Sequence, residues 1–171
     1  MTVEFPRMID LRQINDQPVV LEPDADERRR LAARFGLSAV EAMQAVVKLS
    51  VEGTTVTATG RLTASVIQPC AISGEDFPVA IDEPVWLRFV HPHGGHSPDE
   101  EIELAAEDCD EIEYEGTAFD LGEAIAQTLA LSIDLYAEGP DAERARIEHG
   151  LGGDVESGPF AALAALRKKK D

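Results

Sequence analysis

A long alternation of apolar and polar residues constrains this chain more than any other feature. Every second residue is apolar in segment 45–51, and the same period holds over the eleven residues from Val56 to Val66. A period of two places the apolar side chains on one face of a strand. Gly53 and Thr54, between the two runs, are typical of a two-residue hairpin turn. With a third extended run at 77–90, the sequence predicts an antiparallel meander packed on one face.

Two segments carry the signals of a helix start. Asp24 and Glu27 have the spacing of a capping box, and Gly36 is a natural stop for the helix that follows. Asp120 and Glu123 repeat that spacing at the start of the longest helical pattern. Its apolar stripe consists of Leu121, Ile125, Leu129 and Ile133. We expect the helices at 24–35 and 120–133 to cover the open face of the sheet.

Shorter patterns indicate the remaining elements. Residues 6–14 and 17–22 are typical of two short strands, and Ile112–Tyr114 of a third. Ser38 and Glu41 have the spacing of a second capping box and predict a helical turn or two. Residues 91–109, rich in His, Gly, Pro and acids, predict a loop.

These patterns predict an α+β fold: an antiparallel β-sheet meander covered by two helices, with a flexible C-terminal tail. Residues 1–145 are expected to form a single α+β domain, which suits a chain of 171 residues. Residues 146–171 are expected to form a flexible linker and an amphipathic basic tail. Because no apolar run approaches the length of a membrane span and no apolar leader is visible, we expect a cytoplasmic protein with no membrane partner.

Charge is distributed unevenly along the chain, whose net charge is −18. Between Arg88 and Arg144 there is no Lys or Arg, but there are sixteen Asp and Glu. Basic residues gather in two places: Arg28, Arg29, Arg30 and Arg34, and the terminal Arg167, Lys168, Lys169 and Lys170. An acidic surface repels bare nucleic acid and attracts a basic protein, although such acidity can also serve solubility alone.

Cys70, in the segment "IQPCAISGEDF", has three interpretations: a nucleophile, half of a metal knuckle, or a small buried side chain. Nearby Glu75 and Asp76 disfavour a thiolate, and a knuckle would need a second thiol where Ser73 stands. Free cysteine commonly packs as a small hydrophobe. The sequence therefore favours a structural Cys70.

Three histidines, His91, His93 and His96, are of a type that binds metal. They lie among Pro and Gly without the four-ligand spacing of a structural zinc site, so we expect no metal and no cofactor. A thiol- or metal-dependent hydrolase using Cys70 and the 91–96 histidine loop is the enzymatic alternative. No catalytic triad or phosphate-binding glycine loop supports it, and we expect no enzyme and no small-molecule substrate.

Four segments in order resemble the YceD family, the bacterial large ribosomal RNA subunit accumulation proteins, in their alphaproteobacterial form. They are "ERRRLAARFGL", "GRLTASVIQPCAISGEDF", "FDLGEAIAQTLALSIDLYAEGPDA" and "GPFAALAALRKKK". The resemblance implies a non-enzymatic role in the synthesis, processing or accumulation of 23S ribosomal RNA. Many members have a Cys-x-x-Cys where this chain has Cys70 and Ser73, so a zinc site does not carry over.

Two mechanisms are open for such a factor, with ribosomal RNA or a ribosomal protein of the large subunit as the partner. In the first, the arginines of segment 28–34 and the basic 167–170 tail contact RNA phosphates. In the second, the acidic segment 99–115 shields a basic ribosomal protein. The apolar stripe of the tail, Phe160, Leu163 and Leu166, then docks on the partner.

Overall fold

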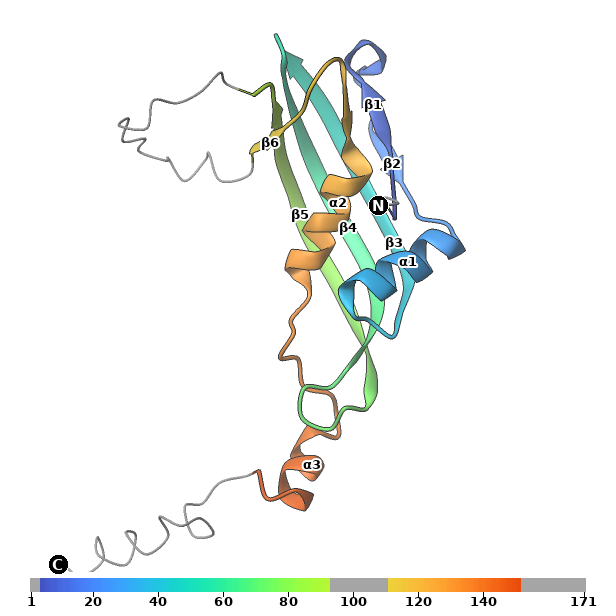
Figure 1. The fold of residues 1–171 in the computed structure, drawn as a ribbon, viewed down its shortest axis with the longest axis vertical. Coiled ribbons are helices and arrows are strands. Elements are labelled where there is room, and N and C mark those ends of the chain that lie inside the picture. The colour runs from blue at the N-terminus through green and yellow to red at the C-terminus, as the bar shows by residue number, and fades with distance from the viewer. Residues whose placement is uncertain (1–3, 93–110, 152–171) are drawn as a thin grey trace, which may run out of the picture. The chain divides into compact units, whose positions relative to one another are not determined.

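The computed structural model describes residues 4–92 and 111–151 of the chain (Figure 1). The strands are β1 (Met8–Asp10), β2 (Val19–Leu21), β3 (Ala39–Glu52), β4 (Thr55–Pro69), β5 (Asp76–Val90), β6 (Glu111–Glu113) and β7 (Ala118–Asp120). The helices are α1 (Ala25–Phe35), α2 (Leu121–Ser132) and α3 (Ala142–Glu148), with a 3-10 turn, η1, at Leu11–Gln13. The predicted α+β class is confirmed. None of the helices in these ranges is both long and apolar enough to cross a membrane.

The chain divides into two compact units. Within the described residues, the first comprises 4–68, 78–92 and 111–134, and the second comprises 69–77 and 135–151. The predicted division into a 1–145 domain and a 146–171 tail stays a prediction, and residues 152–171 lie outside the described ranges.

The main sheet has five strands in the order β2-β3-β4-β5-β6. β3 and β4 pair antiparallel from Glu52↔Thr55 back to Ala39↔Ile67, as the alternation predicts. Gly53 in the connecting turn has a φ of 63°, which glycine adopts without a steric penalty. The sheet departs from a pure meander at β6, which pairs parallel with β5. β1 and β7 form a separate two-stranded sheet.

The helical turn predicted from Ser38 and Glu41 is wrong. β3 begins at Ala39, and the N–H of Ser38 donates to the carbonyl of Ile67 on β4. The pairing register shifts between Val40 and Ala42, which marks a β-bulge. A bulge inserts one residue into the strand and breaks the period of two, so the local sequence does not look like a strand.

Both predicted helices form, with different caps. At α1 the Asp24 carboxylate accepts the N–H of Glu27, and the Glu27 carboxylate accepts the N–H of Asp24, so the capping box is complete. At α2 the Asp120 carboxylate accepts the N–H of Glu123 at 3.1 Å. The Glu123 carboxylate does not return the bond, because it binds Arg34 instead. The second box is therefore only half formed.

The core lies between α2 and one face of the sheet. Of the predicted stripe, Leu121, Ile125 and Leu129 are fully buried and Ile133 is partly buried. Figure 1 shows α2 in front of β4 and β5. The inward-facing residues of the alternating strands pack in the same cluster: Ala45, Val47, Leu49, Val56, Ala58, Leu62, Ala64 and Val66. The predicted covering of the sheet is confirmed for α2, and α1 packs Leu31 and Ala32 into the same core.

The second unit contains a helix that the sequence analysis missed. α3 has Ala142 and Ala145 buried, and the N–H of Ala142 donates to the carbonyl of Gly139. The N–H of Ala71 donates to the carbonyl of Ala137 at 3.0 Å. The loop after β4 and the segment before α3 are thus joined by backbone hydrogen bonds.

Candidate functional site

Arg34, one of the predicted contact residues in α1, is paired with two carboxylates. Arg34 donates from Nη1 to Glu4 at 2.9 Å and from Nη2 to Glu123 at 2.7 Å. These two carboxylates raise the pKa of Arg34 further above its ordinary value, chiefly through the hydrogen bond with Glu123. Arg34 therefore joins the N-terminal segment, α1 and α2, and its charge is already compensated.

The three remaining arginines of α1 differ in their partners. Arg29 forms an ion pair with Asp26 one turn earlier. Arg28 donates to the carbonyl of Pro23 at 3.0 Å, and Arg30 donates to the carbonyl of Glu4 at 3.2 Å. Carbonyl oxygens do not cancel a charge, so among the described residues Arg28 and Arg30 are the α1 arginines that form no ion pair. The charge of Arg30 nevertheless contributes to lowering the pKa of Glu27.

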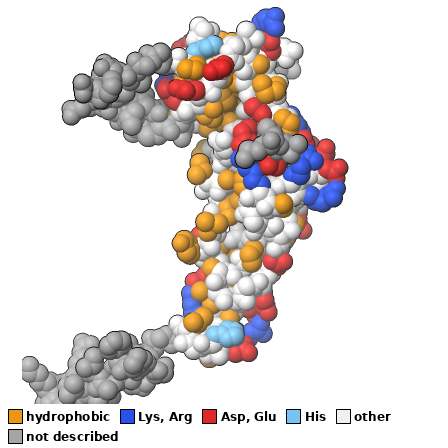
Figure 2. Space-filling view, in the orientation of Figure 1, with side chains coloured by type: hydrophobic (Ala, Val, Ile, Leu, Met, Phe, Trp, Pro, Cys, Tyr) orange, Lys and Arg blue, Asp and Glu red, His pale blue; other side chains and the backbone are white. Residues whose placement is uncertain are grey.

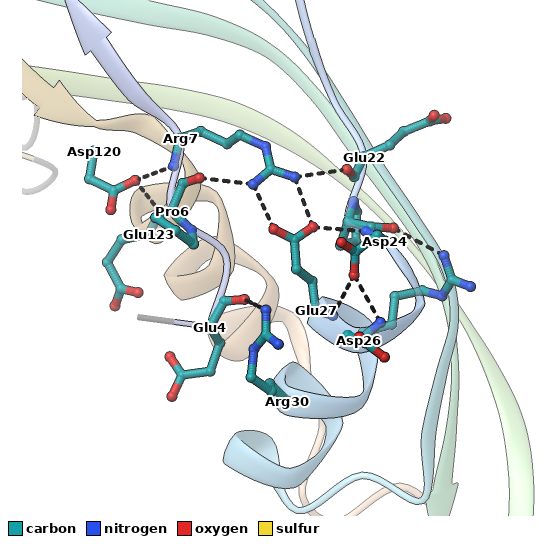
Figure 3. A network of polar contacts seen from close by, with 12 residues as sticks. Glu4, Pro6, Arg7, Glu22, Asp24, Asp26, Glu27, Arg30, Asp120 and Glu123 are labelled. Carbon is teal, nitrogen blue, oxygen red and sulfur yellow. Dashed lines mark hydrogen bonds and ion pairs between the residues drawn. The ribbon is translucent and has the colours of Figure 1, made fainter. Parts of the chain in front are cut away.

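Arg7 forms the centre of a polar network that sequence reasoning missed (Figure 3). Its guanidinium makes two bonds with the Glu27 carboxylate, at 2.7 and 2.8 Å, and its backbone N–H donates to Asp120 at 2.9 Å. The hydrogen bond from Arg7 is the main cause that lowers the pKa of Glu27. Glu27 lies 20 residues from Arg7 and Asp120 lies 113 residues away, so no local spacing indicates the network.

An open groove of about 460 Å³ lies beside α1. Alanines of the helix and Leu37 contribute its apolar part, with Arg28 and Arg29 from α1 and Glu41 from β3 beside them. Of the predicted contact residues, Arg28 and Arg29 both line this groove.

Most of the other basic side chains described are also neutralised. Besides the α1 pairs, ion pairs hold Arg7, Arg12, Arg61, Arg88, Arg144 and Arg146. Glu113 and Glu115, at the end of the acidic segment 99–115, have no ion-pair partner among the described residues. Figure 2 shows acidic side chains gathered where β6 lies. Uncompensated charge on the described surface is therefore mainly negative.

A smaller pocket, of about 140 Å³, lies next to these carboxylates. Phe89, Tyr114 and Phe119 line it, with ring centroids 4.2 Å apart for Phe89 and Phe119 and 5.8 Å apart for Tyr114 and Phe119. Glu113 from β6 and Glu123 from α2 also line it. The pocket combines an aromatic wall with carboxylates.

Cys70 lies at the end of the β4 strand in the second unit and is only 4 % exposed. Its sulfur accepts the backbone N–H groups of Ile72 and Ser73, each at 3.4 Å. Hydrogen bonds from Ser73, side chain and backbone, lower the pKa of Cys70 to about 7, contrary to the expectation from the nearby Glu75 and Asp76. Burial and these bonds describe a thiol that organises a turn.

The histidine loop gives no described metal site. The His91 ring packs against Tyr114 at 4.4 Å between centroids, while His93 and His96 lie outside the described residues. In residues 4–92 and 111–151 no group of three metal-ligating side chains comes together. Cys109, the tail stripe Phe160, Leu163 and Leu166, and the basic Arg167–Lys170 also lie outside the described residues.

Comparison with known protein families shows which family the chain belongs to. The model of the family described as Large ribosomal RNA subunit accumulation protein YceD matches residues 58–167, more than half of the chain. This chain belongs to the YceD family. A role in the accumulation of the large ribosomal RNA subunit goes with that membership. Neither the curated proteins nor the solved structures contain a match to the chain.

The YceD match includes some of the candidate surfaces and leaves out others. It begins in β4 and so includes the aromatic pocket residues Phe89, Tyr114 and Phe119, the acidic segment and Cys70. α1, with its four arginines and the groove beside it, precedes the match. The part of the chain that the YceD model describes is therefore the acidic part.

Proposed function

We propose that this chain supports the accumulation of large-subunit ribosomal RNA by binding a basic ribosomal protein of that subunit, without catalysing a reaction. The observation that carries the proposal is the asymmetry of uncompensated charge. Glu113 in β6 and Glu115 just after it have no ion-pair partner among the described residues, although Glu111 at the start of β6 is paired with Arg88. Most described basic side chains, by contrast, are paired. Such a surface attracts a basic protein and accelerates its association.

Direct RNA binding by the described part of the chain has weaker support. Contacts with phosphates need cations that can exchange their counterions for the RNA. Arg34 already binds two carboxylates, and Arg29 binds Asp26, which leaves Arg28 and Arg30 on α1. A chain of net charge −18 would have to hold RNA against its overall repulsion.

In this proposal the segment 99–115 lies against the basic protein and β6 is its described end. The tail residues Phe160, Leu163 and Leu166 dock on an apolar part of the same partner, and Arg167–Lys170 contact nearby ribosomal RNA. The protein acts in the cytoplasm, where its partner is synthesised. A basic protein shielded in this way is kept from premature contact with RNA until the subunit assembles.

The test measures binding of purified basic proteins of the large subunit, and of a 23S ribosomal RNA fragment, over a salt series. We expect at least one basic protein to bind, with an affinity that falls as salt rises. The double variant Glu113→Lys/Glu115→Lys should weaken this binding, and the matched reversal Arg28→Glu/Arg30→Glu should leave it unchanged or strengthen it. The proposal fails if no basic protein binds at low salt and the RNA fragment binds through Arg28 and Arg30.

A further inference from the structure

We infer that the aromatic pocket beside β6 receives one lysine or arginine side chain of the basic partner. The inference rests on the proposed function, since it assigns the place where that partner is held. The pocket lies in the first unit, where β6, β7 and the first turns of α2 meet. Its volume of about 140 Å³ is below the roughly 300 Å³ at which sites for drug-sized ligands begin. It suits a single side chain.

The aromatic wall suits the long stem and the charged head of such a side chain. Phe89, Phe119 and Tyr114 are only 0 %, 2 % and 6 % exposed and are held in one cluster with each other and with α2, so they form a fixed floor of the pocket before any partner arrives. Lysine and arginine bury their aliphatic stems along apolar surface and keep the charged group at the edge.

The carboxylate that would receive the charge is Glu113. Glu123, also in the pocket lining, is paired with Arg34, and Asp120 accepts two backbone N–H groups through its Oδ1 atom. Glu113 is exposed and has no ion-pair partner among the described residues. It is therefore the acceptor still available to a guanidinium or ammonium group.

The same lining excludes the other classes of occupant. It contains Glu113, Asp120 and Glu123 but no Lys or Arg, so a phosphate or an acidic side chain would be repelled. A purely apolar side chain would gain nothing from the exposed Glu113 carboxylate. A cation with an apolar stem uses both parts of the pocket.

The experiment titrates the full-length protein, labelled for NMR, with ethylguanidinium and with its neutral analogue ethylurea. We expect ethylguanidinium to shift the resonances of Tyr114, Phe119 and Ala124, and ethylurea to leave them unchanged. Glu113→Gln should raise the dissociation constant of ethylguanidinium about three- to tenfold, since one charge-assisted contact is lost. Equal shifts with both probes, or an unchanged constant in Glu113→Gln, would overturn the inference.

Glu115→Gln is the matched control, because it removes the same charge two residues away from an exposed position that does not line the pocket. It should change the constant less than twofold. The same two variants are then tested for binding to the basic ribosomal protein. If both variants and the wild type bind that protein equally, the pocket assignment falls while the proposed function stands. If the wild type binds ethylguanidinium but no basic protein, the proposed function falls.

Discussion

Replacing Gly122 by alanine tests how the N-terminal segment is held on α2. Gly122 is the second residue of α2, and a β-carbon there would come 2.0 Å from the carbonyl oxygen of Phe5 and 2.8 Å from the amide nitrogen of Arg7. Both atoms belong to the backbone, so no side-chain rotation relieves the overlap. We expect the Gly122→Ala variant to displace residues 5–7 from the helix.

Two effects of opposite sign compete in this variant. Alanine is the better helix former and would stabilise α2 by at most about 1 kcal/mol. Displacing the fully buried Phe5 loses roughly 2–3 kcal/mol of burial. The bonds from the N–H of Arg7 to Asp120 and from the N–H of Leu121 to Arg7 add about 1 kcal/mol each. The steric effect is larger, and we expect a net destabilisation of about 3–5 kcal/mol.

The assay is unfolding by guanidinium chloride, followed by far-ultraviolet circular dichroism, in a double-mutant cycle with Phe5→Ala. In the wild-type background Phe5→Ala should cost about 3 kcal/mol. In the Gly122→Ala background it should cost less than about 1 kcal/mol, because Phe5 is already displaced. The reasoning is refuted if Gly122→Ala is as stable as the wild type, or if the two costs simply add.

Three further predictions concern stability. Arg7 lowers the pKa of Glu27 in the folded state, so the ion pair stabilises the fold fully above the unfolded carboxyl pKa of about 4.3. This stabilisation is lost as the pH falls through the lower pKa that Glu27 has in the folded state. In chemical denaturation, the difference in stability between the wild type and Glu27→Gln should therefore shrink below about pH 4. Because the pKa of Cys70 is lowered to about 7, its thiolate adds stability as pH rises from 7 to 9, and Cys70→Ala should lack this rise. Gly60→Ala should cost about 2 kcal/mol or more, measured by thermal unfolding, since its β-carbon would meet the Val46 carbonyl oxygen at 2.0 Å.

Local signals predicted those parts of the fold whose partners are near in sequence. The β3–β4 hairpin follows from the alternation on both sides of Gly53, and its two strands are adjacent in the chain. The start of α1 follows from Asp24 and Glu27, which satisfy each other's backbone N–H groups. The apolar stripe predicted the buried face of α2 because residues three or four positions apart lie on the same face of a helix.

The features that sequence reasoning missed depend on distant partners. The short strand predicted at Ile112–Tyr114 forms as β6, but its parallel pairing with β5, across a connection of about twenty residues, was not predicted. α3 has seven residues, too few for a clear apolar periodicity. The aromatic pocket joins Phe89 to Phe119 across thirty positions. Its carboxylate, Glu113, looks like any other acid of the 99–115 segment.

The arginine-rich helix shows why unpaired charge, and not charge counted along the sequence, decides what such a surface binds. By composition alone, four arginines within seven residues fit either a helix that contacts RNA or a solvated helix face. In the fold, Glu4 and Glu123 approach Arg34 from 30 and 89 residues away and remove one of these charges from any contact with phosphate. At Glu113 the opposite holds: Arg88 pairs with Glu111 at the start of β6, and no described basic side chain forms an ion pair with Glu113. The charge left without a partner in the described fold is therefore negative next to the aromatic pocket, and this is the combination that selects a basic side chain.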